Sequence, residues 1–134
     1  MYEKIKSEID EHLLVINAIK NSIKQIHDAA NLIKNCLSSG GTLYICGNGG
    51  SAADSQHFAA ELTGRFRRER KSLAAIALTT DTSAITSIGN DYSFVEIFSR
   101  QLSGLAAPGD ILLGISTSGR SKNVLHAATW AKQN

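Results

Sequence analysis

The stretch Leu43-Tyr44-Ile45-Cys46-Gly47-Asn48-Gly49-Gly50-Ser51 decides the fold of this 134-residue chain. Four consecutive apolar residues run directly into glycines and a serine, and a helical pattern of apolar residues from Ala52 to Leu62 then leads to Gly64. A continuous apolar strand is typical of a sheet covered on both faces, and a tight strand-to-helix turn requires residues such as glycine and serine. The stretch therefore predicts one strand, loop and helix of a parallel α/β sheet.

Two further strand-to-helix units follow along the chain. The apolar run 73–78 leads into the polar loop 79–83, and the run 111–115 leads into the polar loop 116–121. A helical pattern follows each loop. Parallel strands joined by helices predict a doubly wound, flavodoxin-like α/β sheet.

The N-terminal residues have a different periodicity. Apolar residues recur there in steps of three and four, beginning with Ile5, Ile9, Leu13 and Ile16. This spacing predicts two amphipathic helices, or one helix kinked at Asn21-Ser22. We assign residues 1–40 to an N-terminal helical segment and residues 41–134 to the α/β part of the same domain. Helices of this length could pack against another subunit or cover one face of the sheet, and the sequence does not favour either.

The composition excludes several classes of protein. Apolar residues make up 43% of the chain and charged residues 19%, as in ordinary globular proteins, and the N-terminus has no signal-peptide pattern. No apolar run approaches the ~20 residues of a membrane span, so we expect a cytoplasmic protein with no membrane partner. Cys36 and Cys46 have no zinc-finger or disulfide spacing, and are expected to be buried reduced thiols. The net charge of +2 does not indicate a nucleic-acid partner.

The three predicted loops share one chemistry, being rich in Gly, Ser, Thr and Asn. The carboxyl ends of parallel strands lie at one edge of a sheet, where backbone N–H groups and hydroxyls at helix N-termini bind anionic oxygens. Each loop alone fits an ordinary turn, but the three together favour a ligand site. Because neither GxGxxG nor GxxxxGK[ST] occurs, we predict a phosphorylated small molecule rather than a dinucleotide or nucleoside triphosphate.

A second polar group lies on the helix that follows the first loop. His57 and Glu61 are four residues apart, so they project from the same helix face. This spacing suits a shared metal ion or an acid/base pair, although it is also typical of an exposed hydrogen bond. Asn90-Asp91 is a third polar group, which by itself indicates only a turn.

Five segments carry these residues: 46–54, 56–62, 78–83, 89–91 and 114–119. In content and order they resemble the phosphoheptose isomerases of the sugar isomerase (SIS) domain family. The resemblance implies an SIS-type fold and an aldose–ketose isomerase that converts sedoheptulose 7-phosphate to D-glycero-D-manno-heptose 7-phosphate. It also implies a cytoplasmic homotetramer acting at the first step of ADP-heptose synthesis for lipopolysaccharide or other glycans.

The resemblance also implies roles for particular residues. His57 and Glu61 match zinc ligands, for one ion per subunit, and Glu61 also matches a catalytic acid/base that contacts substrate. The other substrate-binding positions fall in the polar segments, on Asn48, Gly49, Gly50, Ser51, Asn90, Asp91, Ser116, Thr117, Ser118 and Ser121.

The length of the chain departs from the family pattern. Family members continue for roughly another third, which carries the remaining zinc ligands and a second acid/base group, whereas this sequence ends at Asn134. We therefore expect the 134-residue chain to be inactive alone, and to aggregate or depend on contacts between subunits.

Two alternatives to the isomerase remain open. One is a non-catalytic SIS-domain protein, such as the bacterial protein that binds the replication initiator, and the other is a sensor of sugar phosphates. The initiator-binding relative looks to have a small polar residue in place of Glu61 and an interrupted Ser-Thr-Ser-Gly run. Because this chain has Glu61 and Ser118, the isomerase is favoured.

Overall fold

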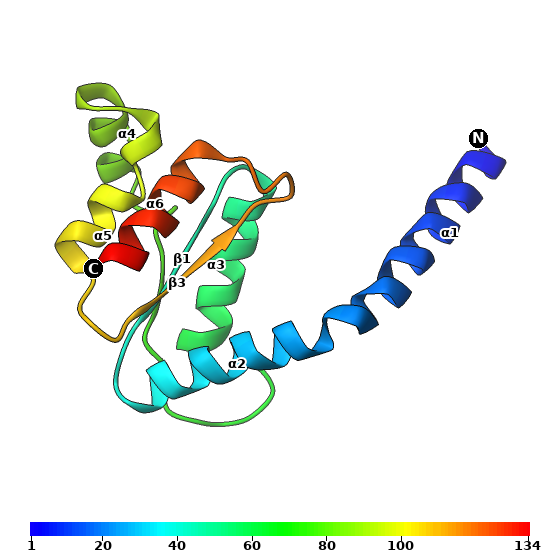
Figure 1. Cartoon of the computed structure of the whole chain (residues 1–134), viewed down its shortest axis with the longest axis horizontal. Coiled ribbons are helices and arrows are strands. Elements are labelled where there is room, and N and C mark those ends of the chain that lie inside the picture. The colour runs from blue at the N-terminus through cyan, green and yellow to red at the C-terminus, as the bar shows by residue number, and fades with distance from the viewer. The chain divides into compact units, whose positions relative to one another are not determined.

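The computed structural model describes residues 1–134, and its elements follow the predicted order (Figure 1). They are α1 (Tyr2–Ala18), the 3-10 turn η1 (Ile19–Ser22), α2 (Ile23–Ser38), β1 (Leu43–Gly47), α3 (Gly50–Thr63), β2 (Ala75–Ala77), α4 (Thr82–Asp91), the 3-10 turn η2 (Phe94–Glu96), α5 (Ser99–Leu105), β3 (Ile111–Ile115) and α6 (Lys122–Gln133). The chain divides into two compact units, Met1–Lys34 and Asn35–Asn134.

The second unit is built on a three-stranded parallel sheet in the order β2-β1-β3. The central strand β1 contains the predicted apolar run 43–46, and all five of its residues are buried. It pairs on both sides, with Leu43 opposite Ala75 of β2 and Ile111 of β3. The predicted parallel α/β sheet is therefore confirmed.

Helices cover both faces of this sheet. Tyr44 and Cys46 share one face of β1 and belong to the main core. The helices on this face contribute Phe98, the N-cap residue of α5, Leu102 of α5, and Val124 and Ala127 of α6. Gly47 belongs to the opposite face, where a Cβ would lie 2.7 Å from the carbonyl oxygen of Ser51 in α3. The close approach of α3 to β1 therefore requires glycine at this position.

Strand β2 is shorter than the predicted run 73–78. It spans only Ala75–Ala77, but the N–H of Leu43 donates to Ala74 O at 2.9 Å and the N–H of Leu78 donates to Ile45 O at 2.8 Å. The ladder ends there because the chain turns into α4, where the Asp81 side chain accepts the N–H of Ala84 at 2.9 Å as an N-cap.

Both cysteines are free and buried, as predicted. Burial raises the pKa of the Cys46 thiol to about 12. This thiol is therefore protonated at neutral pH and is no nucleophile, although it lies immediately before the first polar loop.

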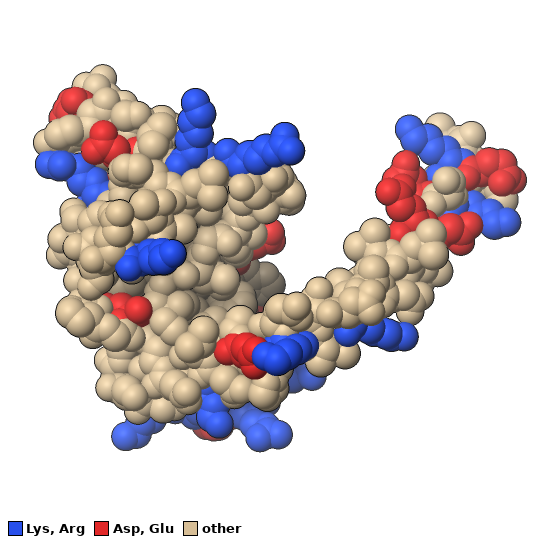
Figure 2. Space-filling view, in the orientation of Figure 1, with Lys and Arg blue, Asp and Glu red and all other residues tan.

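The first unit is helical, and η1 interrupts it at the predicted Asn21-Ser22 position. No residue of α1 is buried. Its apolar stripe, defined as Ile5, Ile9, Leu13 and Ile16, is 49 to 55% exposed. Figure 2 shows charged side chains gathered at the N-terminal end of α1, and residues 12–19 contain no Lys, Arg, Asp or Glu. None of the helices is both long enough and apolar enough to span a membrane.

Candidate functional site

The three predicted loops lie at the carboxyl ends of the parallel strands and therefore at one edge of the sheet. The first loop, Asn48-Gly49, joins β1 to α3, the second loop, 78–81, joins β2 to α4, and the third loop, 116–121, joins β3 to α6. Gly49 has φ 56° at the start of α3, a left-handed conformation that favours glycine.

A pair of side-chain amides connects the first loop to α6. The Nδ2 of Asn48 donates to the Oδ1 of Asn123 at 2.9 Å, and the Nδ2 of Asn123 donates to the Oδ1 of Asn48 at 2.8 Å. Sequence analysis assigned no role to Asn123. Its partner is 75 positions away, so only the fold brings the two amides together.

The second loop is connected to α3 by Gln56, which sequence analysis also left without a role. The Nε2 of Gln56 lies 3.3 Å from Thr79 O and 3.2 Å from Thr79 Oγ1. The Thr79 hydroxyl in turn donates to Ala52 O at 3.4 Å. These contacts place the second loop beside the first two turns of α3.

The third loop presents hydroxyls at the N-terminus of α6. The Oγ atoms of Ser116 and Ser121 lie 3.0 Å apart, and the N–H of Arg120 donates to Ser118 Oγ at 3.2 Å. Ser121 is the N-cap residue of α6, but its hydroxyl caps no backbone N–H. Hydroxyls beside the positive end of a 12-residue helix form a suitable environment for a phosphate group.

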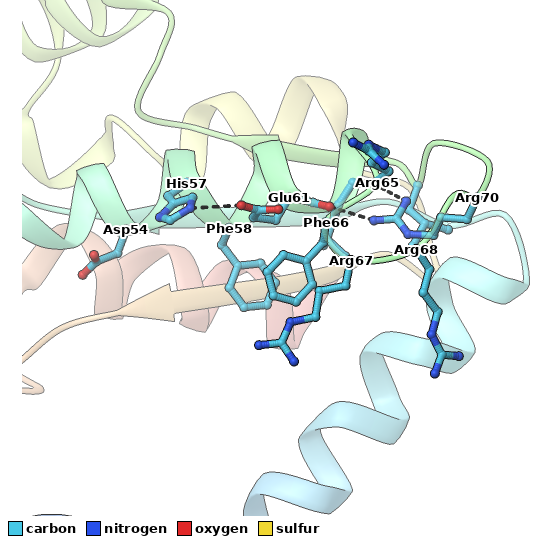
Figure 3. A pocket seen from close by; sticks show the side chains of 11 residues that line it. Asp54, His57, Phe58, Glu61, Arg65, Phe66, Arg67, Arg68 and Arg70 are labelled. Carbon is cyan, nitrogen blue, oxygen red and sulfur yellow. Dashed lines mark hydrogen bonds and ion pairs between the residues drawn. The ribbon is translucent and has the colours of Figure 1, made fainter.

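His57 and Glu61 contact each other on α3, as their spacing predicts. The Nε2 of His57 lies 3.2 Å from Oε1 of Glu61, and the two side chains are 77% and 42% exposed (Figure 3). This exposure leaves both groups accessible to a ligand, and their hydrogen bond directs the carboxylate toward the imidazole.

The pair lies at an apolar hollow of about 780 Å³ with a basic rim (Figure 3). Phe58 and Phe66 lie side by side in Figure 3 and line this hollow, and arginines of the segment 65–70 also line it. Arg70 has a structural role, because its guanidinium donates to Glu61 O and Leu62 O, both at 2.7 Å. It thereby holds the segment that follows α3 against the end of that helix.

The donors present fit part of a zinc site. Imidazole and carboxylate are ordinary zinc ligands, and a catalytic zinc site takes three protein ligands. No group of three or more His, Cys, Asp or Glu side chains gathers in the structure. Residues 1–134 therefore offer two ligands, His57 and Glu61.

Asn90 and Asp91 lie apart from the hydrogen bonds that connect the loops. They are the last two residues of α4, and the Nδ2 of Asn90 donates to Asp91 Oδ1 at 2.8 Å. Both side chains are exposed, and none of their hydrogen bonds reaches the three loops. Their predicted role in substrate binding stays a prediction.

Comparison with known proteins links the whole chain to one group. The family described as SIS domain matches residues 9–134. The phosphoheptose isomerase of Helicobacter hepaticus is 56% identical over 132 residues, covering 98% of this chain and 67% of that protein. Phosphoheptose isomerase 1 of Campylobacter jejuni is 53% identical over 133 residues, covering 99% and 72%.

Solved structures agree with these relatives. The phosphoheptose isomerase of Neisseria gonorrhoeae superposes with a TM-score of 0.90 at 46% identity, covering 98% of this chain and 68% of that one. The phosphoheptose isomerase of Francisella tularensis gives a TM-score of 0.92 at 40% identity, covering 98% and 69%. The similarity thus extends over nearly all of this chain and about two thirds of each relative.

Proposed function

The chain belongs to the SIS domain family and, within it, to the phosphoheptose isomerases, and from this membership we propose that it serves the aldose–ketose isomerisation of sedoheptulose 7-phosphate to D-glycero-D-manno-heptose 7-phosphate. The observation that carries the proposal is the identity of more than half of the residues over nearly the whole chain. We place the reaction at the first step of ADP-heptose synthesis for lipopolysaccharide core, in the cytoplasm.

The reaction moves a proton between C1 and C2 through an enediol, so it needs a base for the carbon acid. Glu61 is the base that we propose, because its carboxylate is accessible and is oriented by His57 at 3.2 Å. It would remove the proton from C1 of the ketose and return it to C2, while the matching proton exchange between O2 and O1 would fall to a second acid/base group outside residues 1–134. Without a metal ion, His57 holds the carboxylate through this hydrogen bond.

We propose that His57 and Glu61 bind a zinc ion in place of the hydrogen bond between them, with the remaining ligands coming from outside residues 1–134. When bound, zinc supplies a Lewis acid that polarises the substrate carbonyl. A carboxylate that binds a metal tightly is a weaker base, so Glu61 serves proton transfer best when its hold on the metal is weak.

The third loop is the proposed phosphate site. Ser116, Thr117, Ser118 and Ser121 offer hydroxyls beside the N-terminus of α6, and the helix dipole favours a dianion there. Phosphate held at this loop would position C1 and C2 through binding energy remote from the reacting carbons. The first loop, with Gly50 and Ser51, and the Asn90-Asp91 pair are the proposed contacts for the sugar.

An isomerisation assay tests the proposed function. We would follow the conversion of sedoheptulose 7-phosphate by NMR, with the 134-residue chain and with a chimera completed by the part of the Helicobacter hepaticus relative that this chain does not span. We expect the chimera to form the heptose phosphate. A folded chimera that binds the substrate without converting it would contradict the assignment.

We also propose a homotetramer, and the apolar stripe of α1 supports it. Four large aliphatic side chains are about half exposed on one face of α1. Their burial against another subunit would stabilise an oligomer. Replacing Ile9 and Leu13 together with Glu should therefore lower the oligomeric state, because charged carboxylates would be buried in the contact. Analytical ultracentrifugation would measure the change. Ser7→Glu on the opposite face of α1 is the control, and equal masses for all variants would count against the stripe as an interface.

A further inference from the structure

We infer that Asn123 is a positioning residue, which holds the Asn48 amide in the orientation that receives the sugar phosphate. This inference rests on the proposed function. Asn123 is only 3% exposed and is one of three buried polar side chains in the chain, with Ser55 and Ser99. Burial of a polar amide is costly unless its hydrogen bonds are made, so the partners of this amide show what it does.

The orientation of the Asn123 amide is fixed by a backbone donor. The N–H of Val124 donates to Asn123 Oδ1 at 3.0 Å. Since a backbone N–H can only donate, the atom that faces it must be the amide oxygen rather than the nitrogen. The Nδ2 group of Asn123 is therefore directed to its other partner, Asn48, to which it donates at 2.8 Å.

The orientation of Asn48 follows from that of Asn123. The oxygen of Asn48 must accept from Asn123, and its nitrogen donates back to Asn123 Oδ1 at 2.9 Å. This bond uses one of the two hydrogens on the Asn48 nitrogen. The second hydrogen is left to donate to an oxygen atom of a ligand, and Asn48 lies half-buried in the first loop, where such a ligand would bind.

The pair also couples two parts of the site. Asn123 is the second residue of α6 and follows Ser121, the last hydroxyl of the third loop. The two hydrogen bonds therefore set the first loop relative to the phosphate site, across 75 positions of sequence. The affinity for a sugar phosphate that spans both loops would depend on the separation of the first and third loops. The affinity of the third loop for a free phosphate ion would not.

A double-mutant cycle tests the inference in the completed chimera, which serves as the parent chain. Binding of sedoheptulose 7-phosphate and of inorganic phosphate would be measured by calorimetry for Asn48→Ala, Asn123→Ala and the double variant. We expect each single variant to bind the sugar phosphate about tenfold more weakly, as for one lost hydrogen bond, and the double variant to bind no more weakly than Asn48→Ala. Inorganic phosphate should bind all three equally.

The control is Ser99→Ala, which removes another buried polar group, bonded to His126 Nδ1 at 2.8 Å between α5 and α6. It should lower stability and leave both affinities unchanged. Additive losses in the cycle, unchanged affinity in Asn123→Ala, or weakened binding of inorganic phosphate in that variant would each overturn the inference. Asn123→Ser, which keeps a polar group but cannot reach Asn48, replaces the alanine variant if that variant unfolds.

A measurement without substrate separates this inference from the proposed function. In the parent chain, one Nδ2 proton of Asn48 should exchange slowly with solvent in ¹⁵N-edited NMR spectra, and in Asn123→Ala both should exchange rapidly. Rapid exchange in the parent chain would overturn the amide pair whatever the substrate. Slow exchange in a chimera that binds no sedoheptulose 7-phosphate would instead preserve the pair and overturn the proposed function.

Discussion

Glu61→Gln should lower the turnover of sedoheptulose 7-phosphate by about 10³-fold, within the range of general acid/base catalysis, and leave its affinity nearly unchanged. Glutamine has the same shape as glutamate but cannot take a proton from carbon. The phosphate, which is held at a different loop, supplies most of the ground-state affinity. The loss should therefore fall on kcat rather than on KM.

The measurement uses the completed chimera, with kcat from the NMR assay and affinity from calorimetry. Glu69→Gln is the matched control, because Glu69 is an exposed carboxylate whose ionic partner, Arg65, lies 4.0 Å away. It should retain full turnover. A Glu61→Gln enzyme with turnover close to that of the parent would show that another group is the base.

Removing the hydroxyls of Ser118 and Ser121 together should weaken the binding of sedoheptulose 7-phosphate by about 100-fold. Hydrogen bonds to a charged phosphate contribute about 1.5 kcal/mol or more each, and two are lost. The variant also loses the loop's hydrogen bonds to Ser118 Oγ and Ser121 Oγ. The bond from the N–H of Gly119 to Ser116 O at 3.3 Å and the φ of 64° at Gly119 should maintain the turn. Calorimetry on the Ser118→Ala, Ser121→Ala double variant gives the affinity directly.

Thr129→Ala is the control for this pair. It removes a hydroxyl from the same helix α6, where Thr129 donates only to the carbonyl oxygen of Leu125 at 3.0 Å. Its affinity for the sugar phosphate should equal that of the parent chain. Unchanged affinity in the double serine variant would show that the phosphate does not bind at the third loop.

The fold could be predicted because its strongest signals are local. The apolar run of β1 and the glycines after it are adjacent in sequence, and the helical spacing of His57 and Glu61 places them together without any tertiary contact. The extent of β2 could not be predicted in the same way. The apolar run 73–78 reads as one strand, whereas its length in the structure depends on where the chain turns into α4.

The rest of the candidate site depends on contacts between distant residues. Nothing near Asn123 in the sequence distinguishes it from an ordinary polar residue in the first turn of a helix, and Gln56 is equally inconspicuous. Their partners, Asn48 and Thr79, become neighbours only when the strands pair. An amide near a helix start that the structure buries is the signal to look for, and burial cannot be read from one sequence.

The position of β1 has a consequence for the thermodynamics of ligand capture. This strand is paired on both sides and fully buried, and the first loop begins where it ends. Asn48 is therefore attached to the most constrained backbone of the sheet. The protein then loses little conformational entropy when a ligand binds to Asn48. Residues 117–120 are exposed, so the proposed phosphate site is built on a less buried backbone than the strand that carries Asn48.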